Sequence, residues 1–534
     1  MTETDSKETG SSRHPLDGRE GYSLRKTVGL FLGPILFAVV LLLPAPREMT
    51  PEGRRMAAVA LLMSVWWITE AIPIPATSLL PLVLYPLLGI VIGKPSSATG
   101  VDRLKQAAME AAKPYAHHLI FLFLGGFMIA LAMQRWNLHR RIAVNIVKRL
   151  SFSPSFLILG FMIATAFLSM WISNSATTMM MLPIALAVVG HIAEQREREG
   201  IAGAKEPEES RFAVCMMLGI AYAASIGGVG TLIGTPPNVL LARHAEEQLG
   251  KRIDFLEWMR VGLPFVIVFL PVAWLTLTRL IYPVRHVRIP RGKEVIEREI
   301  QMLGKMGRGE TMTLIVFVMT ALGWVFLTEK KDIAGVNIPG IQTWFPGVQD
   351  STVAMIGALL LFVLPVSLKR GEFVLNWQWA SKLPWGVILL FGGGFALAGG
   401  FAATGLDEWI SHRVEIFKGG HVLVIITATA TFLIFLTELT SNTATTSMAL
   451  PIFTGIALGL GQDPLLLLVP LTIAASCAFM LPVGTPPNAI AFGSGLVSIP
   501  QMARAGFILN IIGVILITAL TYLLVIPLFG ITVG

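Results

Sequence analysis

Two hydrophilic hexapeptides, Ser173-Asn174-Ser175-Ala176-Thr177-Thr178 and Ser441-Asn442-Thr443-Ala444-Thr445-Thr446, each interrupt a long apolar stretch of this sequence. The first stretch covers residues 156–192 and the second covers residues 422–460. Each arm beside an interruption is shorter than the ~20 apolar residues that a helix needs to cross a bilayer. We therefore predict two re-entrant hairpins, whose polar tips face protein or a water-filled cavity because lipid cannot satisfy free backbone groups.

The composition around these hairpins is that of a membrane protein. Of the 534 residues, 54% are hydrophobic and only 14% are charged, whereas a soluble domain carries about 25% charged residues. Apolar blocks of membrane-spanning length recur near residues 28–45, 56–72, 76–93, 118–134, 211–244, 261–282, 312–328, 352–368, 385–402, 465–495 and 507–531. We predict an all-α polytopic membrane protein with about 11 transmembrane helices plus the two hairpins.

The sequence contains an internal repeat. Residues 169–183 recur as residues 437–451 with eight of 15 positions identical, and Gly125-Gly126-Phe127 recurs as Gly393-Gly394-Phe395. The motif Gly234-Thr235-Pro236-Pro237-Asn238 recurs as Gly484-Thr485-Pro486-Pro487-Asn488. An odd number of predicted crossings separates the copies, so the repeat should be inverted. Inverted repeats with broken helices at matching places are typical of secondary transporters.

Charge and cysteine content exclude several other classes. The net charge of +8 could suggest nucleic-acid binding, but the basic residues flank apolar blocks, which the positive-inside rule explains with the N-terminus in the cytoplasm. We expect residues 1–27 to form a disordered cytoplasmic tail without a signal peptide. Cys215 and Cys477 give no case for a disulfide framework or a metal cluster. No P-loop supports ATP drive.

The repeated motifs suit the binding of an anion together with cations. Ser and Asn cap helices well, so each hairpin tip should start a half-helix whose N-terminus favours a carboxylate. The adjoining carbonyl and side-chain oxygens suit Na⁺. In Gly-Thr-Pro-Pro-Asn the two prolines remove two N–H donors and interrupt the helix. Two copies therefore predict two cation sites with one anion between them.

These paired Ser-Asn-Ser/Thr and Gly-Thr-Pro-Pro-Asn motifs resemble those of the divalent anion/sodium symporter family, which includes sodium-coupled dicarboxylate, citrate and sulfate carriers. The resemblance implies a homodimer that works as an elevator. It implies one Na⁺ site at Ser169, Ser173, Asn174 and the Gly234 backbone, and another at Thr437, Asn442 and the backbone of Thr440 and Gly484. The implied contacts of the substrate carboxylates are Asn174, Ser175, Thr235, Asn442, Thr443, Thr485 and Pro486.

The implied elevator divides the chain into two kinds of domain. The scaffold would comprise residues 28–150 and 284–420, including arm helices at 134–150 and 402–419. The transport domain would comprise residues 151–283 and 421–534, with hairpins at 153–192 and 421–460 and broken helices at 211–244 and 465–495. Ser175 departs from the family's usual threonine, which leaves substrate preference open. Glu438, three residues before the second tip, could tune the cation site or pair with a polar neighbour.

We therefore expect Na⁺-coupled symport of C4-dicarboxylates such as succinate, malate or fumarate, with about two or more Na⁺ ions as the coupling ions. The expected setting is a bacterial inner membrane, in contact with lipids and without nucleic acid. A dicarboxylate exchanger of the same fold, a citrate or sulfate carrier, and a channel stay open as alternatives. A membrane-embedded enzyme is disfavoured, because no His or Lys base adjoins either serine in the sequence.

Overall fold

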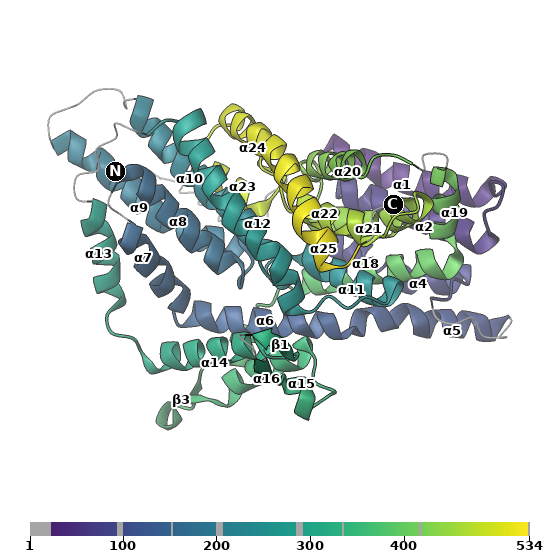
Figure 1. The fold of residues 1–534 in the computed structure, drawn as a ribbon, viewed down its shortest axis with the longest axis horizontal. Coiled ribbons are helices and arrows are strands. Elements are labelled where there is room, and N and C mark those ends of the chain that lie inside the picture. Colours follow the sequence, from purple (N-terminus) through teal and green to yellow (C-terminus); the bar gives the residue numbers. More distant parts are fainter. Residues whose placement is uncertain are drawn as a thin grey trace, which may run out of the picture.

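The computed structural model describes residues 23–92, 100–150, 153–198, 207–284, 292–333, 336–415 and 419–531. These residues are mostly helical (Figure 1), which confirms the all-α prediction. Strands form two short antiparallel hairpins, β1 (Lys330–Ile333) with β2 (Val336–Ile338) and β3 (Pro365–Ser367) with β4 (Glu372–Phe373). Most of the predicted N-terminal tail lies outside the described residues. The predicted end of the tail at residue 27 was too late, because α1 already begins at Leu24. The Ser23 side chain caps this helix by accepting a hydrogen bond from the Lys26 N–H.

The first half of the chain supplies helices α1 to α11. Their bounds are α1 (Leu24–Leu42), α2 (Pro51–Thr69), α3 (Ile74–Thr77), α4 (Leu80–Leu88), α5 (Val101–Ala112), the 3₁₀ turn η1 (Lys113–Ala116), α6 (His118–Arg135), α7 (Leu138–Leu150), α8 (Pro154–Ser169), α9 (Asn174–Arg198), α10 (Pro207–Gly228) and α11 (Pro236–Leu249). Helices α8 and α9 form the predicted first hairpin. Helix α9 has 25 residues and ends at Arg198 rather than at the predicted residue 192, because the helix continues through the charged residues that follow the apolar arm.

The remainder of the chain follows the same plan. Its helices are α12 (Phe255–Leu275) with the π-helical η2 (Thr276–Ile281), α13 (Gly292–Leu303), α14 (Arg308–Val325), α15 (Ile341–Trp344), α16 (Asp350–Val363), η3 (Leu368–Arg370), α17 (Trp377–Ala380), α18 (Trp385–Thr404), α19 (Leu406–Val414), α20 (Val422–Thr437), α21 (Asn442–Gly459), α22 (Leu465–Ala475), α23 (Pro486–Gly493), α24 (Ile499–Leu520), the π-helical η5 (Thr521–Val525) and α25 (Ile526–Leu528). Helices α20 and α21 form the second hairpin.

Both predicted arm helices begin later than the sequence suggested. Helix α6 ends at Arg135, and Asn137 has a left-handed φ of 55°, so α7 starts at Leu138. Residues 402–404 complete α18, which Gly405 terminates with a φ of 70°. Glycine adopts this backbone conformation without steric cost. The helix at the predicted second arm is therefore α19, which is shorter than predicted, while its role as an arm stays a prediction.

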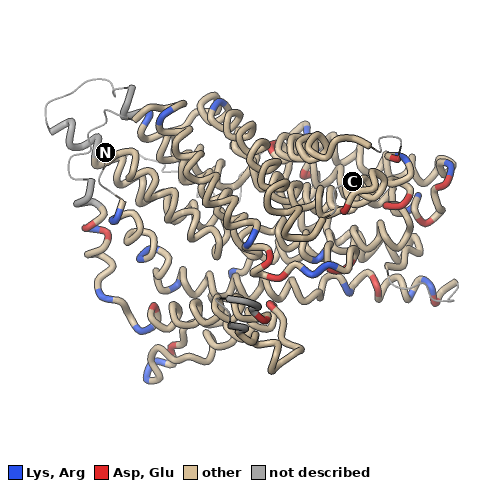
Figure 2. The backbone as a smooth tube through the Cα atoms, viewed as in Figure 1, with Lys and Arg blue, Asp and Glu red and all other residues tan. Residues whose placement is uncertain are grey.

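Six helical segments in the described part of the chain are long and apolar enough to cross a membrane, and five shorter apolar helices accompany them. The count of about 11 spans stays a prediction. The helices differ in how deeply they are buried. In the most apolar stretch of α10, 94% of the residues are buried inside the protein, whereas in that of α1 only 11% are. Charged residues lie mainly toward helix ends and connecting segments (Figure 2). Helix α10 is therefore central, and α1 presents an apolar surface suited to lipid.

Small residues bring some helices into close contact. Helices α6 and α16 pack along each other, and a Cβ atom at Gly125 would lie 2.7 Å from the Ala354 backbone. Helices α8 and α10 also pack together, with Gly227 directly against the backbone of Ala166. Close backbone approach at small residues is a common way for membrane helices to associate. The α8–α10 contact holds the first hairpin against the interruption that follows α10.

Candidate functional site

The tip of the first hairpin is tied to the end of α10. The Ser169 Oγ donates to the Ala224 carbonyl at 2.7 Å. The Asn174 amide, oriented so that both of its polar atoms are satisfied, donates to the Ser169 Oγ at 2.7 Å and to the carbonyls of Ala224 and Gly234 at 3.3 Å. Amide orientation is assigned from such hydrogen bonds. The structure therefore brings together Ser169, Asn174 and Gly234, three of the four ligands predicted for one sodium site.

The interruption between α10 and α11 is held open by side-chain bonds to its own carbonyls. The Asn238 Nδ2 donates to the carbonyls of Gly228 at 3.2 Å and Thr231 at 2.7 Å. The Thr231 hydroxyl donates to the Met170 carbonyl of the hairpin tip. Gly228 is needed here, because a Cβ atom at this position would lie 2.6 Å from the Asn174 amide. These bonds replace helical ones that Pro236 and Pro237 cannot make.

The second copy makes corresponding contacts. The Thr437 Oγ1 lies 2.7 Å from the Asn442 Oδ1 and donates to the Ala475 carbonyl at 3.0 Å. The Asn488 Nδ2 donates to the carbonyls of Ala478 at 3.1 Å and Leu481 at 3.0 Å. Thr437 and Asn442 thus occupy the places of Ser169 and Asn174. The repeat seen in the sequence recurs in the contacts, while the inverted orientation of the two copies stays a prediction.

The copies differ where Glu438 replaces Met170 of the first tip. The buried Glu438 carboxylate accepts hydrogen bonds from the backbone N–H groups of Phe479 at 2.7 Å, Met480 at 2.9 Å and Leu481 at 3.1 Å. It also accepts one from the Asn510 Nδ2 at 2.8 Å. Gly484 lies beside it, since a Cβ atom there would be 3.0 Å from the Glu438 Oε2. Glu438 therefore fastens the second interruption to the second tip, as Thr231 does in the first copy.

Four half-helices begin at these interruptions. Helices α9 and α21 begin at Asn174 and Asn442, while Thr235 and Thr485 are the N-caps of α11 and α23. Helix α23 packs against α9, and α11 packs against α21. Each broken helix thus contacts the hairpin arm of the other copy. Free N–H groups at such helix starts favour anions.

The other predicted ligands make fewer hydrogen bonds to one another. Thr235, Thr443 and Thr485 are buried, Ser173 and Ser175 are partly buried, and Pro486 is exposed. The Ser173 Oγ accepts from the Ala176 N–H at 3.4 Å, and the Thr440 hydroxyl donates to the Leu436 carbonyl at 2.9 Å. In the described residues, no hydrogen bond joins the side chain of Ser175, Thr235 or Thr443 to another predicted ligand.

Sequence reasoning missed several contacts at the site. The carbonyls of Ala224 and Ala475 carry no sequence signal, because any residue offers a carbonyl. Asn510 could have been noticed as an amide within the apolar block 507–531, since polar residues in membrane helices usually have a partner. Thr231 could not have been noticed in this way, because threonine is common in membrane helices, where its hydroxyl usually bonds to a backbone carbonyl of the same helix.

The sequence agrees with one family over nearly its whole length, since residues 24–531 match the profile described as the sodium:sulfate symporter transmembrane region. The chain belongs to this symporter family. The resemblance noted in the sequence is thereby confirmed, and the protein is an integral membrane protein of a transporter family.

Relatives of this symporter carry more specific descriptions. The sodium-dependent dicarboxylate transporter SdcS of Staphylococcus saprophyticus is 42% identical over 519 residues, covering 96% of this chain and 94% of the relative. SdcS of Staphylococcus aureus strain bovine RF122 / ET3-1 is 40% identical over 520 residues, covering 97% and 94%. These similarities extend across both hairpins and both broken helices.

Two solved structures share the fold at low sequence identity. The YdaH transporter of Alcanivorax borkumensis aligns with a TM-score of 0.54 at 14% identity, covering 88% of this chain and 98% of that one. MtrF of Neisseria gonorrhoeae aligns with a TM-score of 0.53 at 12% identity, covering 86% and 96%. The helical architecture is thus one that other membrane transporters adopt.

Proposed function

We propose that this protein is a secondary active transporter that couples the inward movement of small dicarboxylates, such as succinate, malate and fumarate, to a sodium gradient. The observation that carries the proposal is the duplicated set of contacts in which each Asn of a hairpin tip meets carbonyl or hydroxyl oxygens beside a broken helix. The names of the relatives support the choice of sodium and of dicarboxylates. The chain then has no catalytic step.

The polar atoms at each tip fit a sodium ion. Hard cations prefer oxygen ligands, and unwound backbone carbonyls supply them in transporters with broken helices. In addition, the Asn238 Oδ1 and the Asn488 Oδ1 are buried without a hydrogen-bond partner in the described part of the chain. A buried oxygen without a partner is costly, and a cation would remove that cost. In the proposed sites, Ser169, Ser173, Asn174 and Gly234 hold one ion, while Thr437, Thr440, Asn442 and Gly484 hold the other.

The dicarboxylate would lie between the two tips. Its carboxylates would contact the starts of the four half-helices, where free N–H groups and hydroxyls meet: Asn174, Ser175, Thr235, Asn442, Thr443, Thr485 and Pro486. Two bound Na⁺ ions would offset the charge of the dianion, which lowers the cost of removing it from water. Substrate binding would thus depend on prior binding of sodium.

We further propose that transport follows an elevator mechanism in a homodimer in a bacterial plasma membrane, with the N-terminus in the cytoplasm. Residues 151–283 and 421–534 would move as the transport domain against a scaffold of residues 28–150 and 284–420. The cross-packing of α23 with α9 and of α11 with α21 supports a moving unit built from both copies. An elevator requires such a unit because the site must cross the membrane intact.

Radiolabelled succinate uptake into proteoliposomes tests the proposal. An inward Na⁺ gradient should drive concentrative uptake, and replacing Na⁺ by K⁺ or choline should abolish it. Uptake that does not depend on sodium but requires dicarboxylate inside the liposomes would identify an exchanger and reject symport. Sodium-driven uptake of citrate or sulfate in place of succinate would reject the dicarboxylate assignment.

A further inference from the structure

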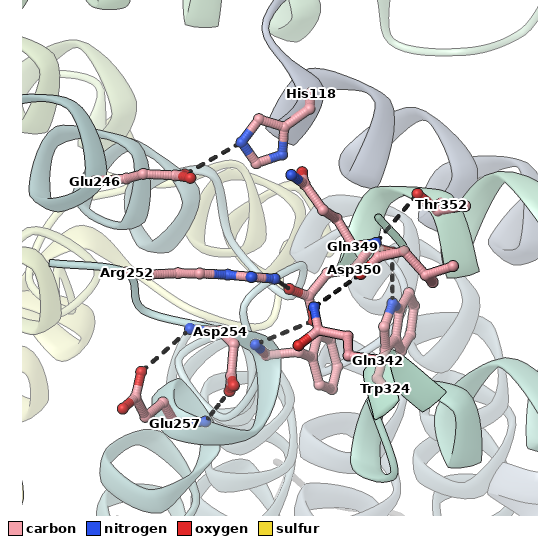
Figure 3. Close-up of polar contacts among 12 residues, drawn as sticks. His118, Glu246, Arg252, Asp254, Glu257, Trp324, Gln342, Gln349, Asp350 and Thr352 are labelled. Carbon is pink, nitrogen blue, oxygen red and sulfur yellow. Dashed lines mark hydrogen bonds and ion pairs between the residues drawn. The ribbon is translucent and has the colours of Figure 1, made fainter. Parts of the chain in front are cut away.

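Two adjacent histidines face two adjacent glutamates at a second polar cluster, away from the hairpin tips. His117 and His118 lie at the start of α6, and Glu246 and Glu247 lie in the last turn of α11. The His118 Nε2 lies 3.2 Å from the Glu246 Oε2 (Figure 3), and the His117 Nε2 lies 3.2 Å from the Glu247 Oε1. The two imidazole centroids are 4.4 Å apart. The cluster therefore joins two helices that are far apart in the sequence.

The donor atoms have the spacing of a metal site. One ligand atom each from His117, His118 and Glu246 lies within 4.8 Å of the other two. In a tetrahedral zinc site with bonds of about 2.0–2.1 Å, neighbouring ligand atoms are about 3.3 Å apart. The His118–Glu246 separation of 3.2 Å already matches this value. Modest side-chain rotation would bring in the third ligand.

The surroundings hold the ligands in place. The Arg243 guanidinium pairs with the Glu247 Oε2 at 2.6 Å and lies 3.9 Å from the centroid of the Phe395 ring. This pairing leaves the Glu247 Oε1 facing His117. The His118 Nδ1 is buried and, within the described residues, makes no hydrogen bond. The hydrogen bond between His118 and Glu246 and the close His117–Glu247 pair therefore do not use all of the polar atoms that the cluster has buried.

An ion can reach the cluster from a cavity. A cavity of about 800 Å³ is lined by Glu110, Lys113, His117, His118, Arg243 and Glu247, together with residues of α18. Its wall therefore includes two of the three principal donors and the carboxylate beside them. Imidazole nitrogens combined with carboxylate oxygens are the ligands that Zn²⁺ and related divalent transition metals accept.

We propose that His117, His118 and Glu246 bind a divalent transition-metal ion such as Zn²⁺, with Glu247 in position to supply a fourth ligand. The consequence for transport rests on the proposed function: α6 belongs to the proposed scaffold and α11 to the proposed transport domain. A metal ion that bridges them holds the two domains together and stops the movement of the transport domain. The cluster is then an inhibitory metal site at the domain boundary.

Co²⁺ binding to the purified full-length chain tests the site directly, because tetrahedral Co²⁺ has characteristic visible absorption bands. The protein should be purified on a tag without histidine. We expect one Co²⁺ per chain, displaced by Zn²⁺, and at least 10-fold weaker binding in His118→Asn and in Glu246→Gln. His118→Asn keeps a donor toward Glu246, so the fold should be retained. His412→Ala, at an exposed histidine of α19, is the control and should bind as the wild type does.

The outcomes separate the site from the transport function. Absence of the absorption bands, or equal affinity in all three variants, would overturn the metal site. If the site exists, Zn²⁺ should inhibit uptake by the wild type at least 10-fold more strongly than uptake by His118→Asn. Metal binding without inhibition would overturn the bridging role. A chain that transports no dicarboxylate would refute the proposed function, while the Co²⁺ titration would still decide the metal site.

Discussion

Replacing Glu438 by glutamine should destabilise the interruption between α22 and α23. The effect should be larger than that of a comparable substitution at the interruption between α10 and α11. The carboxylate accepts hydrogen bonds from three backbone N–H groups and from the Asn510 amide. Glutamine presents an NH₂ group in place of one oxygen, so at least one buried donor loses its acceptor. That loss costs about 1–3 kcal/mol. Neutralising a buried charge recovers part of its desolvation cost, and we expect a net destabilisation of about 2 kcal/mol.

The first copy supplies an internal comparison. Thr231→Val removes the single hydroxyl bond to the Met170 carbonyl, and a neutral hydrogen bond of this kind contributes about 1 kcal/mol. Glu408→Gln changes an exposed glutamate of α19 and serves as the control, because exposed charges contribute little. The thermal unfolding midpoint should therefore fall most in Glu438→Gln, less in Thr231→Val and not measurably in Glu408→Gln.

The assay is thermal unfolding of purified protein in detergent, followed by tryptophan fluorescence with and without Na⁺. Glu438→Gln should also raise the Na⁺ concentration needed for half-maximal uptake, because the carbonyls beside Gly484 lose their support. A variant with the midpoint and sodium dependence of the wild type would show that Glu438 does not fasten the interruption. An equal loss in Glu408→Gln would show that the effect is not specific to the buried carboxylate.

Four further substitutions, with Gly493→Ala as a control, test the site and its packing. Asn174→Ala and Asn442→Ala should each reduce succinate uptake at least about 10-fold, because a hydrogen bond to a charged group contributes about 1.5–3 kcal/mol; near-normal uptake in both would reject the site assignment. Gly227→Ala should destabilise the fold by about 1–3 kcal/mol, the usual cost of overpacking, as judged by unfolding midpoint. Gly493→Ala, where nothing lies within 4 Å of the added Cβ atom, should not. Ser175→Thr adds a methyl group worth about 0.8 kcal/mol when buried, so the KM for succinate should fall about fourfold; an unchanged KM would show that this methyl does not reach the substrate.

Much of the architecture could be predicted because it rests on local signals. The hairpin tips at Asn174 and Asn442 and the interruptions at Thr235 and Thr485 stand out as polar or proline-rich breaks in apolar sequence, and the helices end and begin there. The late start of α19 was missed. Gly405 could either continue a helix or end it, and only its packing environment selects the left-handed conformation.

The carbonyl partners of the site could not be predicted from the sequence. Which carbonyl meets Ser169 depends on how α8 is aligned along α10, and that alignment is set by close packing at Gly227. A shift of one residue would exchange Ala224 for a neighbour without any change in pattern. The tie between Glu438 and Asn510 likewise depends on where α24 passes the second tip. Such contacts depend on how helices far apart in the chain pack together, and no local sequence pattern shows this.

The cross-packing of the two copies has a consequence for biosynthesis. Helix α9 contacts α23, and α11 contacts α21, yet the partners are made only after most of the chain has been synthesised and inserted. Until then, the surfaces of α9 and α11 that these partners cover in the finished protein stay uncovered. Contacts between distant segments form slowly because a long loop must close first. A chain truncated before Pro486 should therefore insert its N-terminal helices but leave the first half exposed to membrane quality control.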